Sequence, residues 1–252
     1  MFENSVSDFN AQFSKLSIDN NAITVKKRTV FDKTKLKETI DNWLNLIEQN
    51  DFDAALKNKI TSGSVPLSSL CECSQGLIPY DKYRGHSEET IKNRIWHADY
   101  KKDETYKKEL AGKDVDRYFV KWNGKTWISY GEWLAAQRRK EFFTQERIIV
   151  REITNPRILA GYTVDEFYNT PSIINCIDFM IDIKFVLGII NSRLLSYYHK
   201  ITSPKANKGL FPKILVNDVR KLPIKIGDDL IQNRLSKLVS EVIKKKNDNP
   251  EN

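Results

Sequence analysis

The sequence predicts a mixed α+β fold, in which a twisted and largely antiparallel sheet packs against helices and amphipathic helices lie near both ends of the chain. Two patterns lead to this prediction. Short apolar runs bounded by polar or turn residues, over 146–153 and 172–179, are typical of strands. Apolar residues that recur every three or four positions, over 34–48 and 228–246, are typical of amphipathic helices. The sequence contains no internal repeat and no low-complexity tract.

The composition describes a chain that can build a core and that carries excess positive charge. Hydrophobic residues make up 40% of the 252 residues and aromatic residues 11%, which is enough for a packed interior. Lys and Arg number 41 against 33 acidic residues, so the net charge is +8. This charge favours a polyanionic partner without identifying one.

The apolar segments and the cysteines indicate the cellular compartment of the protein. The most apolar stretch, residues 172–190, contains two aspartates and a lysine, so it does not predict a membrane span. The N-terminus lacks the apolar segment of a secretory signal. The three cysteines are an odd number, and Cys71 and Cys73 are too close to bridge comfortably in a strand. We therefore expect a cytoplasmic protein without structural disulfides.

The chain is expected to have two regions. Residues 1–62 form an N-terminal arm, without sustained periodicity over its first 30 residues, and a connector or docking helix over 34–48. Residues 63–252 form the main domain, which begins at turn residues and ends in a helix over 228–246. Asp228 is its expected N-cap, and the lysines at its end suit the negative end of the helix dipole.

Within the main domain, the segment 117–130 predicts a hairpin, because Asn123 and Gly124 suit a two-residue type I′ turn. In that register Val120 pairs with Trp127. Further strands are expected over 146–153, 157–168 and 172–179, and an extended segment over 213–226. A single helix is expected from an N-cap at Asp182 through Tyr198.

Motifs of nucleotide-dependent, hydrolytic or metal chemistry are missing from the sequence. The ten glycines are scattered singly, so no glycine-rich loop can hold a phosphate or S-adenosylmethionine. The pair Cys71 and Cys73, with distant histidines, lacks the spacing of zinc sites, and no metal site is expected. One catalytic alternative remains, a metal-dependent nuclease that uses Asp178, Asp182 and Lys184.

Several stretches, in one order, carry a resemblance to a known family. They are GLIPYDKYRG, AGKDVDRYFV, FFTQERIIVREIT, FVLGIINSRLLSYYHK and GLFPKILVNDVRKLPI, between about Val65 and Lys246. This set resembles the C-terminal specificity domain of TaqI-like adenine-N6 DNA methyltransferases, the target recognition part of single-chain type II restriction-modification enzymes. The resemblance implies a sequence-specific double-stranded DNA recognition domain that clamps DNA opposite a methyltransferase domain.

The methyltransferase motifs of that family, the glycine-rich cofactor loop and the Asn-Pro-Pro-aromatic motif, are absent from the sequence. We therefore expect no catalytic residue and no cofactor in this chain, with S-adenosylmethionine and magnesium used only by an associated methyltransferase or endonuclease domain or subunit. Two more interpretations stay open at this point. The chain could be half of a type I specificity subunit, or a protein-interaction domain whose basic surface is incidental.

Candidate DNA-binding residues are basic or aromatic side chains beside turns. The loop before Gly85 contains an arginine that could read a base and a tyrosine beside it. Three consecutive cationic residues, 138–140, follow the end of an expected apolar helix. The lysines of the loop over 203–213 could contact phosphates. The residues are Lys82, Tyr83, Arg84, Arg138, Arg139, Lys140, Lys205, Lys208 and Lys213. Within 187–200, the apolar half is expected to be core, and at least one of Tyr197 and Tyr198 is expected to join it.

Overall fold

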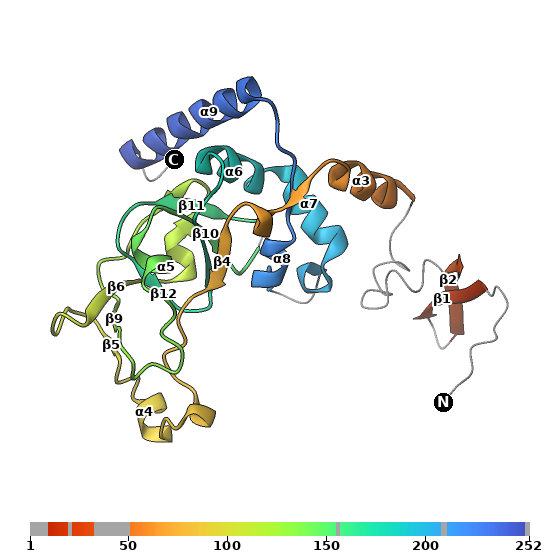
Figure 1. Ribbon diagram of the computed structural model, residues 1–252. Helices are drawn as coiled ribbons and strands as arrows, with labels where there is room; N and C mark the ends of the chain where they lie inside the picture. The colour runs from red at the N-terminus through yellow and green to blue at the C-terminus, as the bar shows by residue number, and fades with distance from the viewer. Residues whose placement is uncertain (1–9, 20–21, 33–50, 155–156, 208–210, 250–252) are drawn as a thin grey trace, which may run out of the picture. The chain divides into compact units, whose positions relative to one another are not determined.

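The structure is a computed structural model that describes residues 10–19, 22–32, 51–154, 157–207 and 211–249 (Figure 1). The chain divides into two compact units, residues 1–58 and residues 59–252. Helix α3 (Asp51–Thr61) spans the boundary between them. The helix expected over 34–48 lies outside the described residues. No helix of the described residues is long and apolar enough to cross a membrane.

The first unit contains an antiparallel hairpin where the sequence predicted an arm without regular structure. Strand β1 (Asn10–Asp19) pairs with β2 (Ala22–Asp32), and the register shifts after Lys15. The sequence of β2 is rich in β-branched residues, which suit a pleated strand. Sequence reasoning passed over this pattern because only one of the two strands shows it clearly.

The mixed α+β prediction is confirmed, and the second unit is built on a four-stranded antiparallel sheet. Its order is β11-β10-β13-β4. The bounds are β4 (Glu72–Gln75), β10 (Arg147–Arg151), β11 (Ala160–Thr163) and β13 (Ile173–Ile177). The strands predicted over 146–153 and 172–179 are therefore confirmed. All five residues of β13 are buried, so this strand needs cover on both faces.

Alternate residues of the central strands serve two different cores. Ile174 and Cys176 of β13 pack with Ile148 and Val150 of β10 in the larger core. Ile149 belongs to a core on the opposite face, which it shares with the first residue of β13. This alternation is the two-residue period of a strand whose two faces are both buried.

Helices cover the first face of this sheet (Figure 1). They are α6 (Ile183–Ile190), α7 (Arg193–Thr202), α8 (Val216–Arg220) and α9 (Asp229–Asp248). Asp228 caps α9 as predicted, and its side chain accepts a hydrogen bond from the Ile231 amide. A Cβ at Gly188 would lie 3.0 Å from Val239, so glycine allows α9 to pack closely on α6.

Two sequence predictions in this helical layer were wrong. Asp182 does cap a helix, but α6 ends at Ile190, because Ser192 leaves the helix and caps α7 with its own side chain. The segment 213–226 is not simply extended. It contains α8, whose first-turn Asp218 accepts the Leu215 amide at 2.9 Å, as well as a short strand.

A second sheet and a short helix cover the opposite face. The sheet order is β12-β6-β9-β5, with β12 parallel to β6 and the other pairs antiparallel. Its bounds are β5 (His97–Ala98), β6 (Tyr106–Leu110), β9 (Trp127–Ser129) and β12 (Tyr168–Asn169). The segment predicted as one strand over 157–168 therefore contains β11 and ends at the start of β12. The covering helix is α5 (Glu141–Thr144).

Short elements complete the second unit. Strand β3 (Val65–Pro66) pairs with β14 (Pro223–Ile224), and β7 (Val115–Asp116) pairs with β8 (Phe119–Val120). The remaining helix is α4 (Glu88–Lys92). Single 3-10 turns are η1 (Leu67–Ser69), η2 (Lys82–Arg84), η3 (Gly112–Asp114) and η4 (Pro204–Asn207).

The predicted hairpin over 117–130 is wrong, although a turn is present. Gly124 has a φ of +82°, but Val120 of β8 pairs with β7, and Trp127 of β9 pairs with β5 and β6. The Asn123 side-chain oxygen accepts the Thr126 amide at 3.1 Å and so closes a wider turn. The Thr126 hydroxyl donates to the Glu109 carbonyl of β6 at 2.6 Å. This bond places the following strand, β9, beside β6 and not beside β8.

One buried side chain joins the helical layer to the sheet. Asn191, at the end of α6, is fully buried, and its side-chain oxygen accepts the Ala160 amide at 3.0 Å while its nitrogen donates to the Ala160 carbonyl at 2.8 Å. The Ala160 carbonyl also accepts from the Tyr118 amide. The Ala160 amide, in contrast, depends on Asn191, because a buried donor needs a partner.

Replacing Asn191 with Ala should therefore lower the free energy of unfolding by roughly 1–3 kcal/mol, because one buried amide loses its acceptor. Urea unfolding of the two proteins measures this difference. Asn217→Ala, which changes an exposed asparagine of α8, is the control and should change stability by less than about 0.5 kcal/mol. Equal stability of the Asn191 variant and the unaltered protein would contradict the assigned role.

Candidate nucleic-acid interface

A basic cavity of about 600 Å³ lies beside α7. Three cationic side chains line it, Arg157, Arg193 and Lys200. None of the ten described residues that line it is acidic, and the others are Thr154, Ile158, Ser196, Tyr197, His199, Ala206 and Pro212. A phosphate placed here would meet positive charge and hydroxyl donors without acidic repulsion.

The cavity wall is one face of α7. Arg193, Ser196, Tyr197 and Lys200 are spaced by three, four and seven positions, which places them along one side of a helix. Leu195 is buried in the core and holds the helix to the sheet. Tyr198 is half-buried, and burial raises the pKa of its phenol, whereas Tyr197 is more exposed. The apolar side of α7 is therefore structural, and its polar side faces the cavity.

His199 ties α7 to the chain segment that closes the cavity. Its Nε2 lies 3.1 Å from the Lys213 carbonyl oxygen, and the side chain is 3% exposed. Burial lowers the pKa of the imidazole, while the Asp218 charge and the hydrogen bond to the Lys213 carbonyl oppose this effect. The imidazole is therefore neutral at pH 7 and serves as a structural donor.

The loop over 203–213 brings two of its predicted lysines together. The Lys213 amide donates to the Lys205 carbonyl at 3.1 Å. The Lys213 ammonium lies 3.3 Å from the Glu152 carboxylate, which neutralises part of its charge. Lys205, in contrast, is exposed on η4. Lys208 lies outside the described residues. Lys205 is thus the stronger phosphate-contact candidate, and Lys213 has a structural partner.

The predicted residues Lys82, Tyr83 and Arg84 form the 3-10 turn η2. Asp81 caps the turn by accepting the Tyr83 amide at 2.8 Å, and Gly85 ends it with a φ of +89°. The Tyr83 side chain is 87% exposed, with the Lys82 ammonium 5.0 Å from its ring centre. The Arg84 guanidinium donates to the Ala135 carbonyl at 2.8 Å, which fixes its direction while it stays on the surface.

The run of Arg138, Arg139 and Lys140 lies elsewhere than expected. No helix precedes it in the described stretch 131–137. The run instead leads into α5, and the left-handed backbone at Arg138, with a φ of +62°, prevents helix there. Arg138 Nε donates weakly to the Gly76 carbonyl at 3.4 Å, and Arg139 pairs with Glu72. Lys140 is exposed, and its charge is the freest of the three for a phosphate.

The predicted residues of η2 and of the loop over 203–213 thus lie in two separate places. A shallow hollow beside η2 shares no residue with the α7 cavity. Figure 1 shows α4, which follows η2, at the end of the unit opposite to α9. Sequence reasoning missed Arg157 and Arg193. The seven-residue spacing of Arg193 and Lys200 could have indicated a shared helix face, but only the folded chain brings Arg157 to it.

The nuclease alternative gains little from the structure. Asp178, Asp182 and Lys184 do border one cavity, together with Glu146. However, one Asp182 oxygen accepts the Phe185 amide at 2.8 Å and the Ser236 hydroxyl at 2.6 Å, so it acts as a helix cap. In the described part of the chain, no group of three potential metal ligands that includes a carboxylate lies close enough together to hold a metal ion. Asp182 is therefore explained as structural.

The sequence of the second unit matches a known family. Residues 107–224 match the model of the TaqI-like C-terminal specificity domain. Residues 107–224 are thus similar to TaqI-like specificity domains. The matched range contains every described residue that lines the α7 cavity, but it excludes η2 and α9.

One curated relative is a much longer protein. The chain is 31% identical over 162 residues to RM.MjaORFECS2P of Methanocaldococcus jannaschii, whose name places it with type II restriction enzymes and methyltransferases. That match covers 60% of this chain and 14% of the relative. The chain thus spans about a seventh of the length of the curated relative it matches.

Two solved structures are loosely similar to this chain. The type IIG restriction endonuclease BpuSI is 9% identical, with a TM-score of 0.47, over 85% of this chain and 31% of that one. The HsdS subunit from Thermoanaerobacter tengcongensis is 10% identical, with a TM-score of 0.43, over 86% of this chain and 50% of that one.

The buried His199 makes the stability of the specificity domain depend on pH. Because its folded pKa lies below the unfolded value of 6.5, the unfolded chain binds more protons just below pH 6.5. The free energy of unfolding should therefore decrease as the pH falls through 6.5 toward the folded pKa. Urea unfolding at several pH values measures this slope. In His199→Gln, which keeps a donor for the Lys213 carbonyl, the slope should be smaller, and an unchanged slope would contradict the assignment.

Proposed function

We propose that this chain is a sequence-specific double-stranded DNA recognition module of a type II restriction-modification enzyme. The observation that carries the proposal is the match of residues 107–224 to a specificity domain. The basic cavity within that range supplies a place for the DNA backbone, and the net charge of +8 favours approach to a polyanion.

In this proposal the α7 cavity positions the duplex and other residues read it. Arg157, Arg193 and Lys200 contact phosphates, which carry no sequence information but fix the register of the protein on the duplex. The exposed Lys205 extends this contact along the loop over 203–213. Sequence is read in the major groove, where an arginine can donate two hydrogen bonds to guanine.

The η2 turn supports the reading role. Arg84 uses one nitrogen on the Ala135 carbonyl, and a guanidinium retains further N–H donors for a base edge. Tyr83 presents an exposed ring beside it. Because Asp81 and Gly85 fix the turn at both ends, these side chains would meet the DNA with little loss of backbone freedom.

The proposed module works with a catalytic partner. A methyltransferase or endonuclease domain or subunit would use S-adenosylmethionine and magnesium and would close on the DNA from the opposite side. Such a system acts on cellular DNA, so the proposed location is the cytoplasm, where the three free cysteines would remain reduced.

The phosphate-contact role predicts a change in salt dependence. Replacing Arg157, Arg193 and Lys200 together with Ala should weaken binding to all duplexes alike and flatten the plot of log affinity against log salt by roughly 0.9 per lost contact. Titration of the purified chain with cognate and scrambled duplexes at several salt concentrations measures both effects. The starting affinity of the lone module should be weak, about 10⁻⁴ to 10⁻⁶ M at physiological salt.

A matched control removes the same number of charges from α9. Arg234, Lys237 and Lys245 are exposed there, and their replacement with Ala should leave most of the salt slope in place. Both variants should keep the melting temperature of the unaltered protein. If the two triple variants change the slope equally, general charge and not the α7 cavity determines binding.

The reading role of η2 predicts a change in specificity. Arg84→Lys keeps the charge but loses the planar fork, so it should cost on the order of 1–3 kcal/mol on the cognate duplex and much less on scrambled DNA. Lys82→Ala, two positions away, should weaken binding to both duplexes by a similar factor. The cognate site is first selected from a randomised pool with the full enzyme. Equal losses on both duplexes for Arg84→Lys would contradict base reading.

A further inference from the structure

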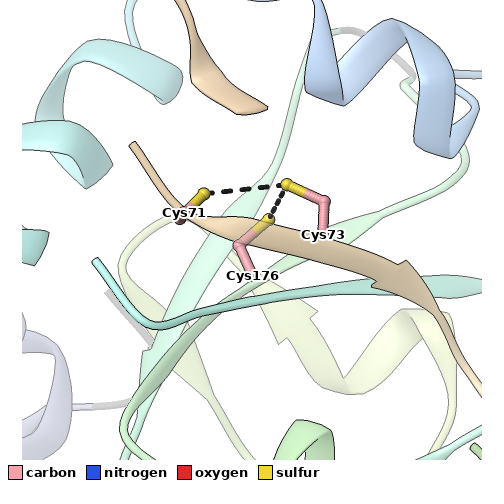
Figure 2. A group of neighbouring side chains, drawn as sticks. All are labelled: Cys71, Cys73 and Cys176. Carbon is pink, nitrogen blue, oxygen red and sulfur yellow. Dashed lines mark hydrogen bonds between the residues drawn. The ribbon is translucent and has the colours of Figure 1, made fainter. Parts of the chain in front are cut away.

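The three cysteines of the chain meet in one cluster, although the sequence separates them by up to 105 residues (Figure 2). Cys71 directly precedes β4, Cys73 lies within it, and Cys176 lies opposite Cys73 on the neighbouring strand β13. The sulfur of Cys73 lies 3.4 Å from that of Cys176 and 3.7 Å from that of Cys71. All three sulfurs lie within 4.8 Å of one another.

These distances match the edges of a metal coordination polyhedron. With zinc–sulfur bonds of about 2.3 Å, two sulfurs of a tetrahedral site lie about 3.8 Å apart. The observed separations of 3.4 and 3.7 Å, with the third below 4.8 Å, require only small side-chain movements to reach this value. Three sulfurs without a nitrogen or carboxylate among them favour a soft, thiophilic ion.

The surroundings supply a compensating charge and an entry path. The Arg220 guanidinium donates to the Cys73 carbonyl at 2.6 Å and lies beside the cluster. A cavity of about 380 Å³ is bordered by Cys71, Cys73 and Arg220, with Ser68, Glu72, Asp178 and Met180 completing its wall. Three thiolates and a divalent cation carry one net negative charge, which Arg220 would balance.

We infer that Cys71, Cys73 and Cys176 bind one thiophilic metal ion of the zinc class, with its fourth coordination position open to this cavity. The sequence did not predict the site, because Cys71 and Cys73 lack a second pair nearby, and only strand pairing brings Cys176 to them. The ion would join the edge strand β4 to the central strand β13. This inference does not depend on the proposed function in DNA recognition.

Packing alone explains the cluster less well. Buried cysteine often serves as a small apolar side chain, and all three residues do belong to the larger core. Yet the chain contains only these three cysteines, all three sulfurs lie within 4.8 Å of one another, and Cys71 and Cys73 border one cavity. Cysteines that served only as small apolar side chains would not need to lie next to one another.

Cadmium titration of the reduced, metal-free chain tests the site. Because the chain has no other cysteine, the ultraviolet sulfur-to-cadmium absorption band reports this cluster alone. The band should saturate at one cadmium ion per chain, and zinc should displace the cadmium. Zinc should also slow the reaction of all three thiols with a thiol reagent by at least about tenfold.

Variants separate the cluster from the rest of β13. Cys176→Ser should lose the saturating band, whereas Ile174→Val, on the same face of the same strand, should keep it. The thiol-protection measurement uses the unaltered chain, so it tests the metal site even if Cys176→Ser does not fold. No band and no protection by zinc would overturn the inference, as would full binding by Cys176→Ser. Oxidation of Cys73 and Cys176 to a disulfide at an unchanged rate with zinc present would also overturn it.

Discussion

The burial of β13 on both faces is the constraint on which the rest of the second unit depends. Every residue of this strand is buried, and its alternate side chains enter different cores. One face therefore needs the layer of α6 to α9, and the other needs α5 and the second sheet. A strand with one solvated face would need only one of these layers.

The basic cavity beside α7 follows from the way this helix packs on the sheet. Leu195 and His199 are buried, so their side of the helix packs against the protein interior. The side with Arg193 and Lys200 therefore faces the cavity. The connection between β10 and β11 then brings Arg157 to the same cavity. The result is a basic surface on a rigid element, which suits contact with a regular phosphate backbone.

Local patterns predicted much of the fold, and non-local contacts account for the rest. The strands β10 and β13, and α9 with its cap, follow from apolar runs and from Asp228. The turn at Asn123 was also visible in the sequence, but its strands pair elsewhere because Thr126 bonds β6. Likewise, the sequence located the basic loop but not its structural ion pair between Lys213 and Glu152, which lie 61 residues apart.

The central claim is that the α7 cavity contacts the DNA backbone, and lysine footprinting tests it most directly. The chain is acetylated briefly at low salt with and without duplex DNA, and each lysine is quantified by mass spectrometry. Our account predicts that DNA protects Lys200 and Lys205, while the exposed Lys237 of α9 reacts at the same rate in both samples. Unchanged reaction of Lys200 and Lys205 under conditions where the duplex is bound would contradict the account.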